Sequence, residues 1–502
     1  MNTAHVPSCR PDRYAKRSWL YILLGALLFF SFFQVANALP VFARQTGQNC
    51  VACHAGGNYP ELTPYGRYFK LTGYSQGERQ WVPVSVMLTG GMAATRNNNA
   101  GDGTNINQQN GRFETSAASV FVAGKILDNL GLFSQYTYSW AASSNNGGVA
   151  NQGQFAADNF DLRYADHYAG EEHDLIWGAS LNNSPGVTDV WNSSPVWAYP
   201  YTVPQGSRGV FGAGAPINTF LDSQAGQKTT GYGTYAYLNK NFYAEIDAYQ
   251  SATGATSFLA YGTSNSNPNA PRTYLKGTNP YVRLAYTTEW GPHNMMLGVL
   301  GMNAAQYGYN LNAGVVDSTG APSGGPPNLS GGTMNYQDRG VDAQYQYLLN
   351  PHTVTAQLRY IKESIYNNTA TNGSAIANGD PSATNQVNKL NSAFAKVSYV
   401  YNATYGAAVA YQNVTGTSDS GAYGLGAGGS LYGSSATNSP NTTAWIPSIW
   451  YQPIQYLRIG LQYTAFTKYM GGNSCYNDTS AGNPCRKASD NNTTWLYAWI
   501  AY

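Results

Sequence analysis

From residue 82 onward, the chain breaks into stretches in which apolar and polar side chains alternate with a period of two. The stretch VTAQLRYI at 354–361 is one example, and LRIGLQYT at 457–464 is another. This period places apolar side chains on one face of a β-strand and polar side chains on the other. Sixteen stretches are predicted as strands, at residues 82–96, 112–127, 131–142, 155–167, 173–182, 229–238, 242–252, 279–288, 293–305, 336–348, 353–365, 387–400, 403–414, 442–452, 455–468 and 493–502.

The connections between these strands alternate between short turns and long polar loops. A soluble β-sandwich would have connections of similar length at both ends, whereas this alternation is typical of an outer-membrane barrel. The expected fold class is all-β, a transmembrane antiparallel β-barrel of about 16 strands with its short turns and both chain ends in the periplasm. The long loops are expected at 97–111, 143–154, 183–228, 253–277, 306–335, 366–386, 415–441 and 469–492.

The closing stretch TTWLYAWIAY favours the same fold. One face of this stretch carries Leu496, Ala498, Ile500 and Tyr502. A final strand that ends on an aromatic residue resembles the signal read by the machinery that assembles outer-membrane barrels.

Residues 1–38 are predicted to be a signal peptide. Four basic residues precede an apolar run at 19–35, which ends in the A-x-A cleavage site Ala36-Asn37-Ala38. The run could instead be an uncleaved anchor, although it is short for a membrane span. After it, the chain has no uninterrupted run of 18 apolar residues, which argues against a helical membrane bundle.

The composition suits a β-rich envelope protein better than a soluble enzyme. Of the 502 residues only 10% are charged, while 55 are glycine and 41 are tyrosine. The chain has 27 basic and 25 acidic residues, and loss of the leader removes four basic residues and Asp12, which leaves 23 against 24. This near-neutral balance indicates neither a nucleic-acid partner nor an anionic-lipid partner. The lipid contact expected is that of the barrel wall with the outer membrane.

Between the leader and the first strand lies the motif Cys50-Val51-Ala52-Cys53-His54. In a Cys-x-x-Cys-His motif both thiols can add to the vinyl groups of one haem while the adjacent imidazole binds the iron. The motif predicts one covalently bound haem c, with Cys50 and Cys53 as anchors and His54 as the proximal ligand. A redox dithiol would ordinarily lie in a βαβ unit, and a zinc site lacks a second ligand pair nearby.

The segment that follows, residues 61–71, is predicted to form a short helix with Pro64 tolerated in its first turn. Its side chains expected to face the haem are Leu62, Tyr65, Tyr68 and Phe69. Arg67 and Lys70 could pair with haem propionates or with inward carboxylates of the barrel, or they could be solvated charges.

The haem domain, residues 39–81, is only about forty residues long, below the size at which a domain usually builds its own core. Because it is joined directly to the barrel domain, residues 82–502, we expect it to plug the lumen from the periplasmic side. It contains no methionine and no histidine besides His54, so a sixth iron ligand must come from the barrel or be absent.

Met87 is the first candidate for that distal ligand. The outward face of the stretch VPVSVMLTGG is formed by Val84, Val86 and Leu88. Alternation then turns Met87 inward, although it could also be an ordinary methionine that fills the lumen. Met92 has the opposite parity unless the glycine pair before it forms a bulge. Weaker options are His293 and Met296.

The sequences LPVFARQTGQNCVACH and PELTPYGRYFKLTGY, followed by a barrel of about four hundred residues, resemble the fused monohaem cytochrome-porins of the outer membrane. That family includes the outer-membrane iron-oxidising cytochrome c of neutrophilic and acidophilic iron oxidisers. The specific match covers roughly residues 40–74, and the rest agrees in architecture. Carried over to this chain, the family's haem attachment falls on Cys50 and Cys53 and its proximal ligand on His54.

The resemblance implies an Fe(II):cytochrome c oxidoreductase that passes electrons from extracellular Fe(II) through the haem to a periplasmic electron carrier, another c-type cytochrome. The residues themselves support an electron conduit more firmly than they support iron, because the acidic residues of the loops are scattered. These acids are Asp102, Asp189, Asp222, Asp317, Asp380, Asp419 and Asp478. A weak encounter site would nevertheless suffice for outer-sphere electron transfer.

Two alternatives stay open from the sequence. One is a conduit for another extracellular redox partner, and the other is a solute porin in which the haem segment is a structural plug. Either a filled lumen or a polar channel fits the charges expected to point inward, which are Arg163, Glu245, Asp247, Arg283, Asp342 and Arg359.

The remaining cysteines indicate an oxidising compartment. Cys9 leaves with the leader, while Cys475 and Cys485 lie close together in a segment rich in glycine and asparagine. Their spacing predicts a disulfide that closes a small loop.

Overall fold

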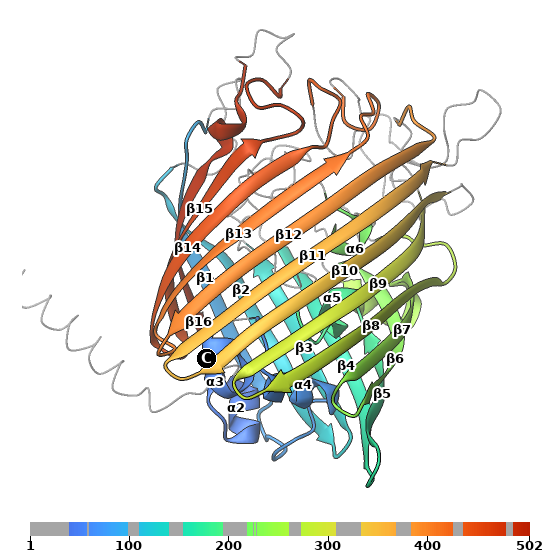
Figure 1. The fold of residues 1–502 in the computed structure, drawn as a ribbon, viewed down its shortest axis with the longest axis vertical. Helices are drawn as coiled ribbons and strands as arrows, with labels where there is room; N and C mark the ends of the chain where they lie inside the picture. Colours follow the sequence, from blue (N-terminus) through green and yellow to red (C-terminus); the bar gives the residue numbers. More distant parts are fainter. Residues whose placement is uncertain are drawn as a thin grey trace, which may run out of the picture.

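The chain folds into a tilted barrel with short turns at one end and longer loops at the other (Figure 1). This is a computed structural model, and it describes residues 40–57, 60–98, 110–139, 154–193, 218–223, 225–226, 228–260, 273–307, 333–367, 383–424, 435–477 and 485–502. The predicted signal peptide and much of the predicted long loops lie outside these residues.

Sixteen strands form one closed antiparallel barrel in which every strand pairs with its neighbour in sequence and the first pairs with the last. This confirms the predicted fold class and the strand count. The strands are β1 Val84–Thr95, β2 Phe113–Leu127, β3 Leu130–Ser139, β4 Gln154–Ala169, β5 Asp174–Asn182, β6 Thr229–Leu238, β7 Phe242–Ser251, β8 Asn279–Trp290, β9 His293–Tyr307, β10 Thr333–Leu349, β11 His352–Asn367, β12 Val387–Tyr401, β13 Tyr405–Gly416, β14 Thr442–Ile454, β15 Leu457–Lys468 and β16 Thr493–Ala501.

The alternation of side chains in the sequence becomes an outer apolar face and an inner polar face. Val299 on β9 and Val341 on β10 are directly opposite each other and exposed on the outside. On the inside, the next pair along, Asp342 opposite Gly298, carries a buried carboxylate. Such a wall keeps every backbone hydrogen bond between strands and leaves no open edge.

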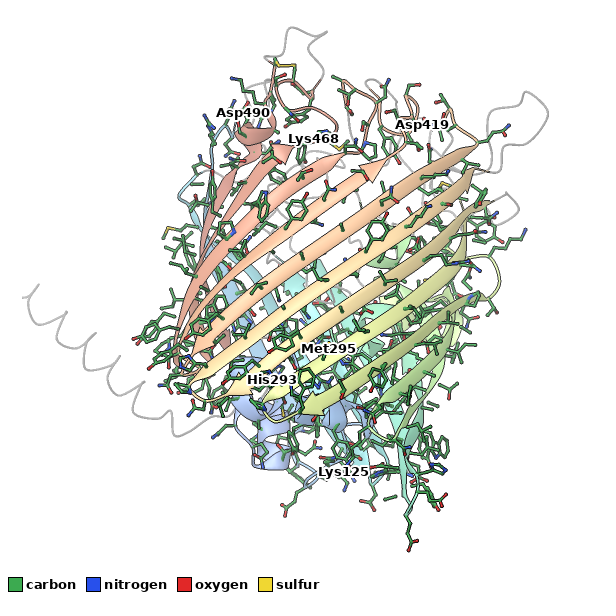
Figure 2. The ribbon with its side chains drawn as sticks, viewed as in Figure 1. Lys125, His293, Met295, Asp419, Lys468 and Asp490 are labelled. Carbon is green, nitrogen blue, oxygen red and sulfur yellow. A yellow bond between two sulfur atoms is a disulfide. The ribbon has the colours of Figure 1, made fainter. Side chains whose placement is uncertain are left out.

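The tight turns lie at the same end of the barrel as the chain's C-terminus (Figure 1). In the turn between β6 and β7, Asn239 and Lys240 have φ angles of 51° and 57°, and Asn402 and Ala403 adopt similar angles between β12 and β13. Two successive residues with positive φ match the right-handed twist of paired strands. Figure 2 shows Lys125 and His293 towards this end and Asp419, Lys468 and Asp490 at the opposite, long-loop end.

The N-terminal segment, which we define as residues 40–81, lies at the short-turn end (Figure 1). It contains the helices α2 Pro40–Thr46, α3 Cys50–Cys53 and α4 Pro64–Leu71 and the 3-10 turn η1 Ala55–Gly57. The helix predicted from residue 61 begins at Pro64, because the Thr63 side chain caps it by accepting a hydrogen bond from the Gly66 N–H.

The described parts of the connection between β5 and β6 lie inside the barrel. Its first part forms the short helix α5 Pro185–Thr188, and its last part forms α6 Phe220–Ser223. Residues 189–191 are almost fully buried, and the Trp191 carbonyl accepts hydrogen bonds from Gln344 and Gln357 of the inner wall. The long connection predicted at 183–228 is present between β5 and β6, but nothing in the sequence indicated that its described parts would lie against the inner wall.

Cys475 and Cys485 form a disulfide with their Cα atoms 5.2 Å apart, as their spacing predicted. It lies at the long-loop end, close in sequence to the 3-10 turn η4 Ala488–Asn491; a further 3-10 turn, η2 Gly254–Ala260, follows β7.

Among the residues that the structure describes, no helix is long and apolar enough to cross a membrane.

Because lipid would surround the outer face, a charge at mid-height should destabilise the barrel more than one near its edge. Val409 on β13 points outward opposite Val397. We expect Val409→Arg to lower the free energy of unfolding by about 2–4 kcal/mol, and Thr415→Arg, on the same strand nearer the long loops, by about 0–1 kcal/mol. Reversible urea unfolding in lipid vesicles, followed by tryptophan fluorescence, measures both. Equal losses would show that the two sites have the same surroundings.

Candidate functional site

The Cys-x-x-Cys-His motif is held by hydrogen bonds to the residues that precede α4. Cys50 and Cys53 occupy the single turn of α3, and His54 leaves it in an extended conformation with its N–H bound to the Cys50 carbonyl at 2.8 Å. The Thr63 N–H donates to the Cys53 carbonyl at 2.9 Å, and the Thr63 hydroxyl donates to the Ala52 carbonyl. The motif is therefore held in place by its own helical turn and by the hydrogen bonds from Thr63.

Gly66 lets α4 approach the motif closely. A Cβ atom at this position would lie 2.2 Å from the Cys53 carbonyl oxygen, which is closer than non-bonded atoms can approach. Gly66 is buried inside α4, where glycine costs helix stability relative to alanine. The glycine is thus required by the contact between α4 and α3 and not by the helix itself.

Cys50, Cys53, His54 and Met87 all line one cavity between the N-terminal segment and the barrel wall. Its empty volume, counting the part open to solvent, is about 1120 Å³. Its aromatic lining comes from both parts of the chain and consists of Phe42, Phe69, Tyr74, Phe121, Phe133 and Trp499. A large, mainly apolar cavity beside two thiols and an imidazole suits a haem.

Met87 points into the barrel, as the parity of β1 predicted. Its side chain is 7% exposed, whereas Met92 is 41% exposed on the outer face even though the register shifts at Thr89 and Gly90. The weaker candidates lie away from the cavity. His293 contacts the Tyr345 hydroxyl through Nδ1 at 2.7 Å, and Met296 is buried in a separate cluster with Trp191.

Burial controls the protonation of the motif. It lowers the pKa of the His54 imidazole to about 3, and the Arg458 cation acts in the same direction. A neutral imidazole has the lone pair that a metal ligand needs. Burial, with a smaller effect of Cys50, raises the pKa of the Cys53 thiol to about 11. The two cysteines are not joined to each other, and the Cys50 thiol lies 3.2 Å from the Gln455 side-chain oxygen.

Of the four side chains expected to face the haem, two lie at the cavity. Leu62 and Phe69 line the cavity. Tyr65 is exposed, and the ring of Tyr68 packs instead against His167 of β4 at a centroid distance of 6.1 Å. The prediction is wrong for these two tyrosines, because α4 packs against the barrel wall on the face that carries Tyr68.

Arg67 and Lys70 are buried, so neither is a solvated charge. Arg67 donates to the side-chain oxygens of Asn294 and Gln346 at 2.7 and 3.1 Å, and Lys70 donates to the Asp189 carbonyl at 2.9 Å. Burial lowers the pKa of Lys70 to about 8 and that of Arg67 to about 10. Lys70 also lines the cavity, which makes it the residue of this pair that a haem propionate could reach.

Polar contacts connect the N-terminal segment to the inner wall at several further points. The Tyr74 hydroxyl donates to Asp161 at 2.6 Å, and Asp161 also pairs with Arg163 at 2.8 Å. On the other side, Glu61 forms an ion pair with Lys396. The six side chains predicted to point inward, which are Arg163, Glu245, Asp247, Arg283, Asp342 and Arg359, are all buried inside the barrel.

Sequence reasoning missed the aromatic wall of the cavity. It used the face of the closing strand that carries Leu496 and Ile500, which is indeed exposed. The opposite face of β16 carries the buried residues Trp495, Tyr497 and Trp499, and Trp499 reaches the cavity. The same alternation that identified the outer face would have identified these inward rings.

The residues that the structure describes contain no group of three or more His, Cys, Asp or Glu side chains placed to hold a metal ion. Asp189 and Asp222 are buried in the lumen, and Asp419 accepts hydrogen bonds from backbone and side-chain donors of its own loops. The other acids considered as iron contacts lie outside the described residues, at Asp102, Asp317, Asp380 and Asp478.

No protein-family model and no curated protein matches this chain. Solved structures that are similar to it include the outer membrane channel DcaP of Acinetobacter baumannii, with 10% identity, a TM-score of 0.44, and coverage of 84% of this chain and 96% of that one. OmpF of Salmonella typhi in complex with daunomycin matches with 15% identity, a TM-score of 0.43, and coverage of 84% and 97%. An anion-selective porin from Comamonas acidovorans matches with 10% identity, a TM-score of 0.38, and coverage of 84% and 98%.

Proposed function

We propose that this protein is an outer-membrane electron conduit that carries one covalently bound haem c. It would oxidise extracellular Fe(II) and pass the electrons to a periplasmic carrier, a second c-type cytochrome. The observation that carries the conduit is the shared cavity, in which Cys50, Cys53, His54 and Met87 meet although Met87 belongs to a different part of the fold. The choice of Fe(II) rests on the resemblance of residues 40–74 to the cytochrome-porins.

The outer face of the barrel supports the membrane location. Apolar residues are exposed along its strands, among them Leu297, Val299 and Leu358, each at least half exposed. Aromatic side chains are exposed near the short turns, including Tyr168, Phe242, Trp290 and Tyr405. An apolar band edged by aromatic residues is the surface that a lipid bilayer requires of a barrel.

The residues of the cavity have distinct roles in this proposal. Cys50 and Cys53 would hold the haem by thioether bonds, neutral His54 would be the proximal ligand, and Met87 would be the distal one. Lys70 offers a cation for a propionate. When bound, the haem supplies reversible one-electron transfer at its iron. The aromatic side chains would give the haem an apolar shell, and such a shell is one of the features that set the potential of an iron centre.

The contents of the lumen favour electron transfer over solute passage. The N-terminal segment and the β5–β6 connection contact each other inside the barrel, where Asn192 donates to the Pro60 carbonyl at 2.7 Å. The inward rings of Trp495 and Tyr497 on β16 stack with centroids 4.4 Å apart and lie between Trp499 and the long-loop end. An electron can cross such packed aromatic side chains where a hydrated solute cannot pass.

Two other functions fit parts of this arrangement. A conduit for a different extracellular redox partner would use the same cavity, since outer-sphere transfer needs only a weak encounter at the surface. A solute porin would use the barrel and keep the N-terminal segment as a structural plug.

We expect the full chain in a planar bilayer to conduct far less than an open barrel of 16 strands, because two segments and several ion pairs fill the lumen. Single-channel recording measures this directly. Stable conductance of open-porin size from haem-loaded protein would favour the solute porin instead.

Anaerobic mixing of the haem-loaded protein with Fe(II) should reduce the haem rapidly, as followed by its absorbance. His54→Ala keeps both thioether cysteines but removes the proximal ligand, so we expect Fe(II) to reduce this variant slowly or not at all. If dithionite reduces the wild type readily while Fe(II) leaves it oxidised, the iron assignment falls and a conduit for another donor remains.

Replacement of Met87 tests the distal ligand. We expect Met87→Leu to lose the weak near-infrared band of methionine-bound Fe(III) haem and to lower the reduction potential, because thioether ligation favours the reduced iron. Met92→Leu is the matched control, since Met92 lies on the same strand but faces outward. Identical spectra and potentials in both variants would mean that Met87 only fills the lumen.

A further inference from the structure

Three cations lie next to one another on the outer wall of the barrel. Arg339 of β10 is directly opposite Lys362 of β11, and both are exposed. Lys362 is opposite Asn391 of β12, so Lys389, two residues further along β12 and also exposed, completes a diagonal row. We call these three residues the outer-wall cation cluster. The three strands lie side by side on the wall that faces the viewer in Figure 1.

No carboxylate of the described residues neutralises this cluster. The neighbouring acids Asp338 and Glu363 have the opposite parity and are buried inside the barrel. The Arg339 guanidinium donates to neutral oxygens, namely the Asn303 side chain at 3.0 Å and the Asp338 carbonyl at 2.7 Å. Like charges directly opposite each other destabilise an antiparallel pair, so Arg339 and Lys362 call for an anion from outside the chain.

The cluster lies at the boundary of the apolar band. The next outward pair towards the short turns is Val341 opposite Tyr360, and the pair after it is Ala343 opposite Leu358. From there to the short turns the outward positions of β10 and β11 carry no charge. A lipid whose chains lie along Val341 and Leu358 would therefore place its headgroup at the three cations.

We propose that the outer-wall cation cluster binds the phosphate groups of a phosphorylated glycolipid in the outer leaflet. Its side chains are spaced across three adjacent strands, about 4.8 Å apart at the backbone, which suits a headgroup with more than one phosphate. The near-neutral composition gave no sign of an anionic-lipid partner. Only three of the basic residues form the cluster, and strand register, which composition does not reveal, makes them neighbours. This inference rests on the proposed membrane location and is independent of the haem.

The test is a titration of the purified full-length protein in neutral detergent with bisphosphorylated lipid A, with bound lipid counted by native mass spectrometry. The variant Arg339→Gln/Lys362→Gln/Lys389→Gln should bind on the order of 100-fold more weakly, since each cation near a lipid headgroup contributes about 1 kcal/mol. The matched control Arg79→Gln/Lys125→Gln/Lys240→Gln removes the same charge at the short-turn end and should bind like the wild type.

Two further arms identify the ligand. Dephosphorylated lipid A should bind the wild type no more tightly than bisphosphorylated lipid A binds the cluster variant. Inorganic phosphate should compete poorly with bisphosphorylated lipid A for the wild type, because it lacks the acyl chains. Equal affinity of the wild type and the cluster variant, or equal affinity for both lipids, would overturn the proposal. Circular dichroism establishes that each variant keeps its strands, and the haem absorbance of the same samples reports on the conduit separately, so failure of one proposal is not failure of the other.

Discussion

The hydrogen-bonded seam between the first and last strands is the constraint on which the rest of this structure depends. It closes the barrel, and it also builds the cavity, because Met87 of β1 is directly opposite Ala501 of β16 and both line it with Trp499. The N-terminal segment continues straight into β1, so the same strand joins the Cys-x-x-Cys-His motif to the wall. A slip of β1 by one residue would turn Met87 towards lipid, and a slip of β16 would turn Trp499 towards lipid, so either slip would dismantle the site.

The N-terminal segment is too short to form its own core and relies on contacts with the barrel wall for its stability. A segment of about forty residues buries too little apolar surface to be stable alone. Here its buried polar groups find partners on the inner wall, as Arg67 does with Asn294 and Tyr74 does with Asp161. A buried polar group without a partner is costly, and these partners belong to strands distant in sequence. The ordered N-terminal segment therefore depends on the closed barrel.

The sequence was sufficient to predict each feature that depends only on which face of its own strand a side chain occupies. All sixteen strands, the inward direction of Met87 and the outward direction of Met92 follow from a period of two. Features that depend on contacts between distant strands could not be predicted in the same way. The inward course of the β5–β6 connection, the packing of Tyr68 against His167 and the meeting of Arg339 with Lys362 all depend on register or on a far wall.

The same separation of inner and outer faces explains how one barrel can combine an aromatic cavity with a charged interior. Around the motif the wall is aromatic, so burial keeps His54 neutral and fit to bind a metal. Higher in the lumen, cations and carboxylates pair with each other, as Arg283 does with Asp342. In the proposed conduit, an electron would cross this interior through packed side chains, whichever reductant reaches the outer surface.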